Sequence, residues 1–217
     1  MSGWWRFSTR LGPVLLRARG EALSDLRFEA VSAAALELPQ LDATAPAVLR
    51  EAARQLDEYL GARRRAFELP LHVEGSAFER RVWQALAGIG YGRRISYAAL
   101  AVELGLGAGH ARAVARAVGA NSLLVVVACH RVVGSDGALR GYAGGLERKR
   151  ALLELESAHR AGPGAQPAPR GGRENLGRPC VFSRAPPGPG CAQPAPRGGR
   201  ENLGRPCVFS KPRTEAC

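Results

Sequence analysis

The composition of the chain changes near Ala158, and this change limits how much of it can fold. The segment AQPAPRGGRENLGRPCVFS at residues 165–183 recurs letter for letter at residues 192–210, in a stretch rich in Pro, Gly and Arg. Such a composition cannot bury enough apolar surface to offset the entropy cost of ordering the chain. Two copies are too few for a solenoid. We therefore expect residues 158–217 to be a disordered tail.

Cysteine usage points to a reducing compartment. Of the five cysteines, only Cys129 lies in the first 157 residues, so no disulfide framework can hold the folded part together. No apolar run approaches the roughly 18–20 residues that a membrane span needs. The opening MSGWWRFSTR lacks the apolar stretch of a secretory signal and is expected to start the mature chain. We expect a cytoplasmic protein with no membrane association.

The positive charge is unevenly distributed. The chain carries a formal net charge of +12; residues 1–75 hold 10 basic and 10 acidic side chains, whereas residues 76–158 hold 11 and 6. A basic second half favours a polyanionic partner, nucleic acid first, although a solvated basic face is an equally plain explanation.

The first 74 residues indicate a small α/β domain. Short apolar segments between residues 4 and 38 are broken by glycines and predict two or three strands of a small sheet. Apolar residues at helical spacing then predict a helix over residues 46–60, which Gly61 ends. No cluster of catalytic type occurs in this part, so we interpret it as a scaffold.

A second unit, residues 75–157, begins with a helix and contains a helix-turn-helix pattern. Ser76 followed by Glu79 is a capping box, which starts a helix. Ser96 can cap the segment YAALAVEL, a glycine-rich turn follows, and HARAVARAV forms the next helix with Arg112 and Arg116 on one face. Helix pairs with exposed arginines are common, so this pattern alone indicates DNA binding only moderately.

The rest of the second unit is built around a cysteine. A buried strand is predicted over residues 123–127, Cys129 follows, residues 134–137 form the turn of a hairpin, and residues 146–156 form the last helix. A thiol is a weak nucleophile until it loses its proton, which a histidine such as His130 can promote. Neighbours on an extended strand point to opposite faces, so their contact requires a bend or a bridging water. A buried structural cysteine is the alternative.

Four motifs together identify a family. The segments FERRVWQAL, GRRISYAALA, ARAVARAVGAN and ACHRVVGSDGALRGYAGGLERKRALLELE resemble the O6-alkylguanine-DNA alkyltransferases, with a match over roughly residues 5–157. The resemblance implies an α/β (α+β) fold, with a ribonuclease H-like domain at residues 1–74 and a helix-turn-helix, winged-helix-like alkyltransferase domain at residues 75–157. It implies repair by irreversible, single-turnover transfer of an alkyl group from O6-alkylguanine, and more weakly O4-alkylthymine, in duplex DNA.

The resemblance also assigns the reacting groups. Cys129 would accept the alkyl group as a thiolate, with His130 as its base through a water and Glu156 orienting the histidine. Asn121 would bridge the helix-turn-helix to the active-site segment. Tyr97 would contact the flipped guanine and protonate it as it leaves, because a guanine anion is a poor leaving group.

DNA and pocket residues follow from the same resemblance. Arg112 would fill the gap left by the extruded base, and the small residues of its helix would let that helix approach the minor groove. The Ala143 amide would face the guanine oxygen and the Val132 carbonyl its exocyclic amine, with glycines where the backbone approaches the ligand. The residues expected at the DNA are Ser96, Tyr97, Ala111, Arg112, Ala115, Arg116 and Arg131; those expected in the pocket are Val132, Leu139, Gly141, Tyr142, Ala143 and Gly144.

The resemblance implies a monomer without metal or other cofactor, acting on DNA in the cytoplasm at the nucleoid, or in the nucleus of a eukaryotic host. Two family prolines are replaced, by Ser122 and Ala128, which removes backbone restraint near the thiol. Three alternatives stay open. A sensor of alkylated guanine would replace Cys129, typically by tryptophan. A Cys-His hydrolase would need an oxyanion hole and would turn over. A helix-turn-helix regulator would bind a defined site, usually as a dimer.

Overall fold

The computed structural model describes residues 3–29 and 38–160. The tail predicted to be disordered lies outside the described residues from residue 161 onward. All described residues belong to one compact unit of the chain. A division into two domains near residue 75 stays a prediction.

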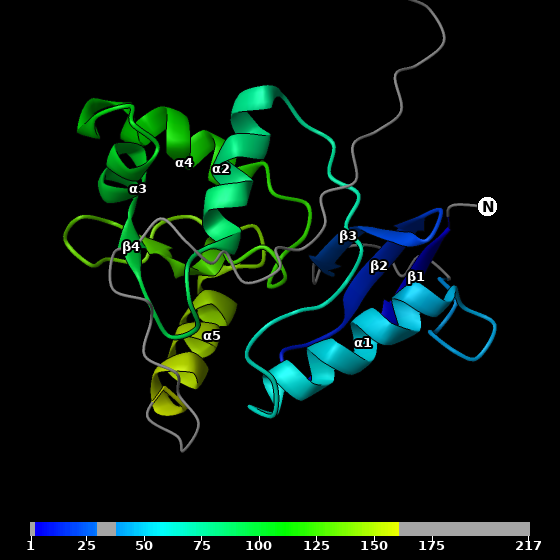
Figure 1. The fold of residues 1–217 in the computed structure, drawn as a ribbon. Helices are drawn as coiled ribbons and strands as arrows, with labels where there is room; N and C mark the ends of the chain where they lie inside the picture. Colours follow the sequence, from blue (N-terminus) through cyan, green and yellow to red (C-terminus); the bar gives the residue numbers. More distant parts are fainter. Residues whose placement is uncertain (1–2, 30–37, 161–217) are drawn as a thin grey trace, which may run out of the picture. The chain divides into compact units, whose positions relative to one another are not determined.

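The described N-terminal segment forms a three-stranded antiparallel sheet, as predicted. Its strands are β1 (Trp4–Phe7), β2 (Val14–Arg19) and β3 (Ala22–Phe28), paired in the order β1-β2-β3. Buried and less buried residues alternate along β2, which is the pattern of a sheet with one face on a core. Helix α1 (Ala47–Leu60) packs against β2 and β3 with its apolar stripe (Figure 1). The predicted helix over residues 46–60 is thus confirmed.

Helix α2 (Ala77–Ala87) starts at the predicted capping box. The Ser76 hydroxyl accepts from the Glu79 amide at 3.2 Å, and Glu79 Oε2 accepts from the Ser76 amide at 2.8 Å. The indole of Trp83 donates to the carbonyl of Ala117 at 2.7 Å. This bond fixes α2 against the second helix of the helix-turn-helix.

The predicted helix-turn-helix is present (Figure 1). Helix α3 (Tyr97–Glu103) is capped by the Ser96 hydroxyl, which accepts from the Ala99 amide at 3.0 Å. A glycine-containing turn follows, in which Gly105 has φ +72°, a conformation that favours glycine. Helix α4 (Ala111–Gly119) then buries its apolar face and leaves Arg112 and Arg116 exposed.

The strand predicted over residues 123–127 is wrong. Only Leu123 forms an isolated bridge, to Leu26 of β3, and the backbone then turns at Val125, whose φ is +70°. The Val127 amide donates to the Leu123 carbonyl within the turn, and the Leu124 amide donates to the Leu26 carbonyl of β3, both at 2.9 Å. The segment therefore forms a compact buried turn that β3 supports through one residue.

The segment around the cysteine also differs from the prediction. Residues Cys129–Arg131 form a 3-10 turn, so the strict alternation of neighbouring side chains along an extended strand does not apply to Cys129 and His130. Strand β5 (Val132–Val133) pairs in parallel with β4 (Ile95–Ser96) rather than in a hairpin, although a turn does form at residues 134–137. Helix α5 (Leu146–Ala158) ends two residues later than predicted. No helix within the described ranges is long and apolar enough to cross a membrane.

Candidate active site

Cys129 lies at the start of the 3-10 turn and is 4% exposed. Its Sγ atom accepts a hydrogen bond from Asn121 Nδ2 at 3.1 Å. Burial raises the pKa of the Cys129 thiol to about 11, and the Asn121 hydrogen bond opposes part of this rise. The resting side chain is therefore a thiol, and a base must take its proton before it can act as a nucleophile.

His130 is fully buried and is held by Glu156. The distance from His130 Nε2 to Glu156 Oε1 is 2.8 Å. Burial lowers the pKa of His130, so the imidazole is neutral at neutral pH. Because Nε2 faces a carboxylate, it carries the ring proton and leaves Nδ1 as the acceptor. Nδ1 is buried and has no hydrogen-bond partner in the described part of the chain. The ring thus keeps a free base nitrogen, and His130 directly follows the thiol residue Cys129 in the chain.

Glu156 receives hydrogen bonds from several parts of the chain. Arg131 Nε lies 3.1 Å from both carboxylate oxygens, and the Gly92 amide donates to Oε2 at 2.9 Å. The Tyr59 hydroxyl also donates to Oε1. Burial raises the pKa of Glu156, but the donors His130 and Arg131 outweigh burial and bring the pKa to about 2. The carboxylate is therefore ionised and can orient the imidazole.

Arg131 does not lie where a DNA contact was predicted. It is 7% exposed, pairs with Glu156 at 2.9 Å and also donates to the carbonyl of Ile89. A buried guanidinium paired in this way stabilises the carboxylate instead of a phosphate. We correct its role accordingly.

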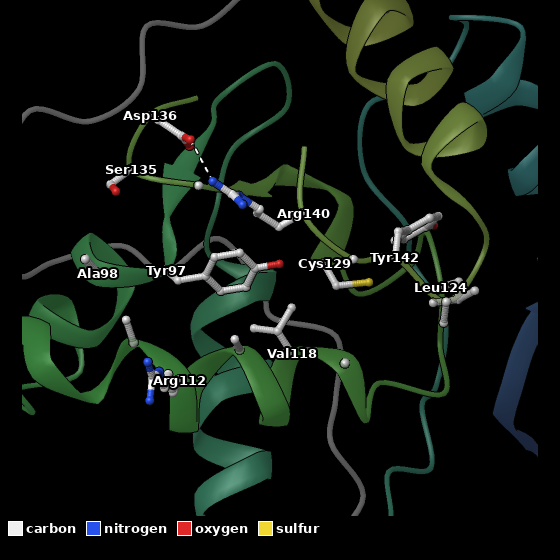
Figure 2. Close-up of a pocket in the computed structure, with 16 residues that line it drawn as sticks. Tyr97, Ala98, Arg112, Val118, Leu124, Cys129, Ser135, Asp136, Arg140 and Tyr142 are labelled. Carbon is white, nitrogen blue, oxygen red and sulfur yellow. Dashed lines mark hydrogen bonds and ion pairs between the residues drawn. The ribbon is translucent and has the colours of Figure 1, made fainter. Parts of the chain in front are cut away.

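Cys129 and Tyr97 line a cavity of about 940 Å³ between the helix-turn-helix and the loop after β5. Figure 2 shows the Tyr97 ring reaching across the cavity with its hydroxyl toward Cys129. Burial, and then the neighbouring Cys129, raise the pKa of Tyr97, so its hydroxyl keeps its proton and can donate it.

Four of the seven residues predicted to face DNA line this cavity, namely Tyr97, Ala111, Arg112 and Ala115. Ala111, Arg112 and Ala115 of α4 line it, and the Arg112 side chain points away from Cys129 (Figure 2). Arg116 is exposed one turn further along α4 and does not line the cavity. Ser96 does not line the cavity either and caps α3 through the bond from the Ala99 amide.

Three of the six predicted pocket residues line the cavity: Gly141, Tyr142 and Ala143. Leu139 does not, and the buried residues Val132 and Gly144 serve the protein's own packing. The Val132 carbonyl already accepts from Lys149 Nζ at 2.6 Å. A Cβ atom on Gly144 would lie 2.6 Å from the Tyr142 ring and 2.7 Å from the Phe28 ring. The absence of a side chain at Gly144 therefore leaves room for two aromatic rings of the protein. We had predicted that it would leave room for a ligand.

Sequence reasoning missed two buried groups near the site. Tyr59 lies on the buried face of α1, and a buried tyrosine needs a partner for its hydroxyl, which is the signal that could have singled it out. Lys149 is fully buried on α5 and donates to the carbonyls of Val132 and Arg140. The cavity rim also includes the exposed ion pair Asp136–Arg140. Within residues 3–29 and 38–160 no group of three His, Cys, Asp or Glu side chains could hold a metal ion.

This arrangement suits a nucleophilic displacement in which sulfur is the attacking atom. The Cys129 thiol lines a cavity across which a proton-donating phenol faces it, and the next residue in the chain, His130, is a neutral imidazole held by an ionised carboxylate. Removing the thiol proton generates the nucleophile, and the phenol can protonate a departing group.

Known proteins are similar to this chain in sequence. The family model described as "6-O-methylguanine DNA methyltransferase, DNA binding domain" matches residues 77–158. The chain is 40% identical over 146 residues to the methylated-DNA–protein-cysteine methyltransferase of Methanosarcina barkeri, covering 67% of this chain and 91% of the relative. It is 40% identical over 149 residues to the protein of the same name from Mycobacterium bovis, covering 68% and 88%.

A solved structure is similar as well. The crystal structure of Mycobacterium tuberculosis OGT in complex with DNA aligns with a TM-score of 0.63 and 37% sequence identity, covering 72% of this chain and 93% of that one. The structure of the Mycobacterium tuberculosis O6-methylguanine methyltransferase aligns with a TM-score of 0.64 and 36% identity, covering 76% and 96%. The similarity therefore extends over both the sheet and the helix-turn-helix.

Proposed function

Because this chain belongs to the methylated-DNA–protein-cysteine methyltransferase family, we propose that it repairs DNA by moving the alkyl group of O6-alkylguanine, and more weakly of O4-alkylthymine, onto its own Cys129. The observation that carries this proposal is the position of Cys129 in the cavity, with the neutral His130 as the next residue of the chain: Glu156 holds its Nε2 atom and its Nδ1 atom is left without a partner among the described residues.

The transfer proceeds in one displacement. The Cys129 proton passes to His130 Nδ1, through a bridging water, and the resulting imidazolium is stabilised by Glu156. The thiolate attacks the alkyl carbon, the carbon–oxygen bond breaks, and its electron pair goes to the guanine. Tyr97 then donates a proton to the departing base. The thioether has no easy return to a thiolate, so each protein molecule reacts once and no cofactor takes part.

DNA is held on the helix-turn-helix side of the cavity. The alkylated oxygen lies inside the base stack, so the nucleotide must be extruded before a buried thiol can reach it. Helix α4 carries small residues and the exposed Arg112 and Arg116, which suits entry into the minor groove and contact with the backbone. We propose a monomer that acts in the cytoplasm on nucleoid DNA, or in the nucleus of a eukaryotic host.

The test is the intact mass of the protein after incubation with a duplex oligonucleotide that carries one O6-methylguanine. A single increment of about 14 Da, mapped to the peptide that contains Cys129 and missing from Cys129→Ala, is the expected result. Peptide mapping is needed because four further cysteines lie in the C-terminal part of the chain. Binding of the lesion without a mass change would instead indicate a sensor, and turnover without an adduct would indicate a hydrolase.

A further inference from the structure

The hydroxyl of Tyr59 lies at the centre of the network around Glu156, although Tyr59 belongs to α1 and is separated from Glu156 by 97 positions. The residue is fully buried. Its hydroxyl donates to Glu156 Oε1, the same oxygen that His130 Nε2 contacts, and lies 3.3 Å from that nitrogen. One phenol therefore touches both the carboxylate and the imidazole of the relay.

The environment keeps this hydroxyl a donor. Burial raises the pKa of Tyr59 far above its usual range, and the charge of Glu156 raises it further. The phenol therefore stays protonated at neutral pH. Since its one proton goes to Glu156, the phenol oxygen can face the His130 Nε2–H group only as an acceptor.

We propose that Tyr59 is a positioning residue for alkyl transfer: its hydroxyl fixes Glu156 Oε1 in the orientation that holds His130, so that helix α1 takes part in the relay. This inference rests on the proposed function. Tyr59 does not line the cavity, and it acts through Glu156 and His130, with Arg131 also interacting with its hydroxyl.

Removing the hydroxyl has two separate consequences. Glu156 loses one of the donors that fix its rotation, so His130 is held less well for accepting the thiol proton. Glu156 also loses a hydrogen bond that offsets part of its negative charge. Its attraction for a protonated His130 ring becomes stronger, which favours the imidazolium form. The groups that surround His130 and would share this change are Glu156 and Lys149 on α5, Arg131 and Cys129 in the 3-10 turn, and Tyr59 on α1.

The chain supplies a matched control. The ring of Tyr91 packs edge-on against the ring of Tyr59, with centroids 5.7 Å apart. Its hydroxyl is also buried, but within the described ranges it has no hydrogen-bond partner. Tyr59→Phe and Tyr91→Phe therefore delete the same atom from two neighbouring rings, and only the first deletion removes a hydrogen bond to the relay.

The experiment measures single-turnover transfer from an O6-methylguanine duplex by both variants and the wild type across a series of pH values. We expect Tyr59→Phe to react about tenfold more slowly and to lose activity at a higher pH than the wild type as the solution is acidified, because His130 is protonated more readily. We expect Tyr91→Phe to match the wild type in both respects. Equal behaviour of the two variants, or a slower Tyr59→Phe with an unshifted pH profile, would overturn the inference.

A second measurement needs no variant and so does not depend on how well Tyr59→Phe folds. In the wild type, the Tyr59 hydroxyl proton should give a downfield NMR signal with a nuclear Overhauser cross-peak to the Nε2 proton of His130. Absence of that cross-peak would contradict the proposed geometry. If the wild type itself transfers no alkyl group, the proposed function fails; if it does and the two phenylalanine variants behave alike, only the role of Tyr59 fails.

Discussion

Asn121 Nδ2 lies 3.1 Å from Cys129 Sγ and 3.0 Å from the carbonyl oxygen of Val127, so one side-chain amide holds both the reactive sulfur and the turn that leads to it. Its Oδ1 atom accepts from the Leu123 amide at 3.0 Å. Asn121 follows α4 directly. The end of the helix-turn-helix is thus tied to the nucleophile through a single residue.

Replacing Asn121 by Ala should weaken both the fold and the thiolate. The loss leaves buried backbone groups unpaired and should cost about 1–3 kcal/mol in the free energy of unfolding. It also removes a donor that lowers the pKa of Cys129, so that pKa should rise further. Urea unfolding measures the first effect. The rate of iodoacetamide alkylation against pH, followed on the Cys129 peptide, measures the second; an unchanged profile would argue against the hydrogen bond.

Replacing Tyr97 by Phe should slow transfer from DNA without changing the intrinsic reactivity of Cys129. The hydroxyl is proposed to protonate the departing guanine, so transfer from an O6-methylguanine duplex should fall at least about tenfold. Iodide leaves without a proton, so iodoacetamide alkylation of Cys129 should stay within about twofold of the wild-type rate. Equal slowing of both reactions would show that Tyr97 serves the thiol rather than the leaving group.

The buried His130 and Glu156 make stability depend on pH in a defined direction. Below the usual His pKa of 6.5 the unfolded chain takes up a proton that the buried, neutral His130 does not, so stability falls as pH falls. Between 4.5 and about 2, the unfolded state also protonates Glu156 while the native carboxylate stays ionised, which costs about 3 kcal/mol more. Urea unfolding over this range should show a continuous decline.

A control for this pH dependence is the exposed His110. His110→Gln should leave the decline below pH 6.5 unchanged, because that decline is assigned to the buried ring. Constant stability between neutral pH and the onset of Glu156 protonation would contradict the assignment of a neutral, buried His130.

The helices and the positions of the candidate site residues could be predicted because their signals are local or belong to recognisable motifs. The capping box at Ser76 and the cap at Ser96 are read from residues three positions apart. The turn at Val125 could not be predicted, because a run of Leu and Val favours a strand and contains no residue type that favours a positive φ. The predicted DNA contact of Arg131 was wrong because its partner, Glu156, lies 25 positions away along the chain. The position of Arg131 next to His130 does not indicate this ion pair.

Restoring proline at position 128 should stabilise the protein. Ala128 has φ −73°, which proline prefers, and its amide makes no hydrogen bond to any described residue. Ala128→Pro should therefore add about 0.5–1 kcal/mol to the free energy of unfolding by restricting the unfolded chain. Ala120→Pro is the control: its φ is −77°, but its amide donates to the Arg116 carbonyl at 3.1 Å, so this variant should lose stability. Destabilisation by both would refute the argument from φ.

Gly144 should not tolerate a side chain, whereas Gly141 should. A Cβ atom at Gly144 would overlap the rings of Tyr142 and Phe28, and moving them should cost about 1–3 kcal/mol. A Cβ atom at Gly141 would meet nothing within 4 Å. Thermal unfolding of Gly144→Ala and Gly141→Ala should separate the two, and similar melting temperatures would show that the loop adjusts freely.

Strand β3 reaches the active-site segment directly, since the Leu26 amide donates to the Ser122 carbonyl and the Leu26 carbonyl accepts from the Leu124 amide, both at 2.9 Å. Residues 77–158 contain Asn121, Cys129, His130 and Glu156. Leu26, which makes both of these bonds, lies outside that range. A chimera that joined this segment to the N-terminal part of a distant homologue would keep all four residues. Its third strand would come from the homologue, however, and would lie beside the turn that positions the sulfur. Exchange of modules between family members is therefore constrained at Leu26, a residue with no chemistry of its own.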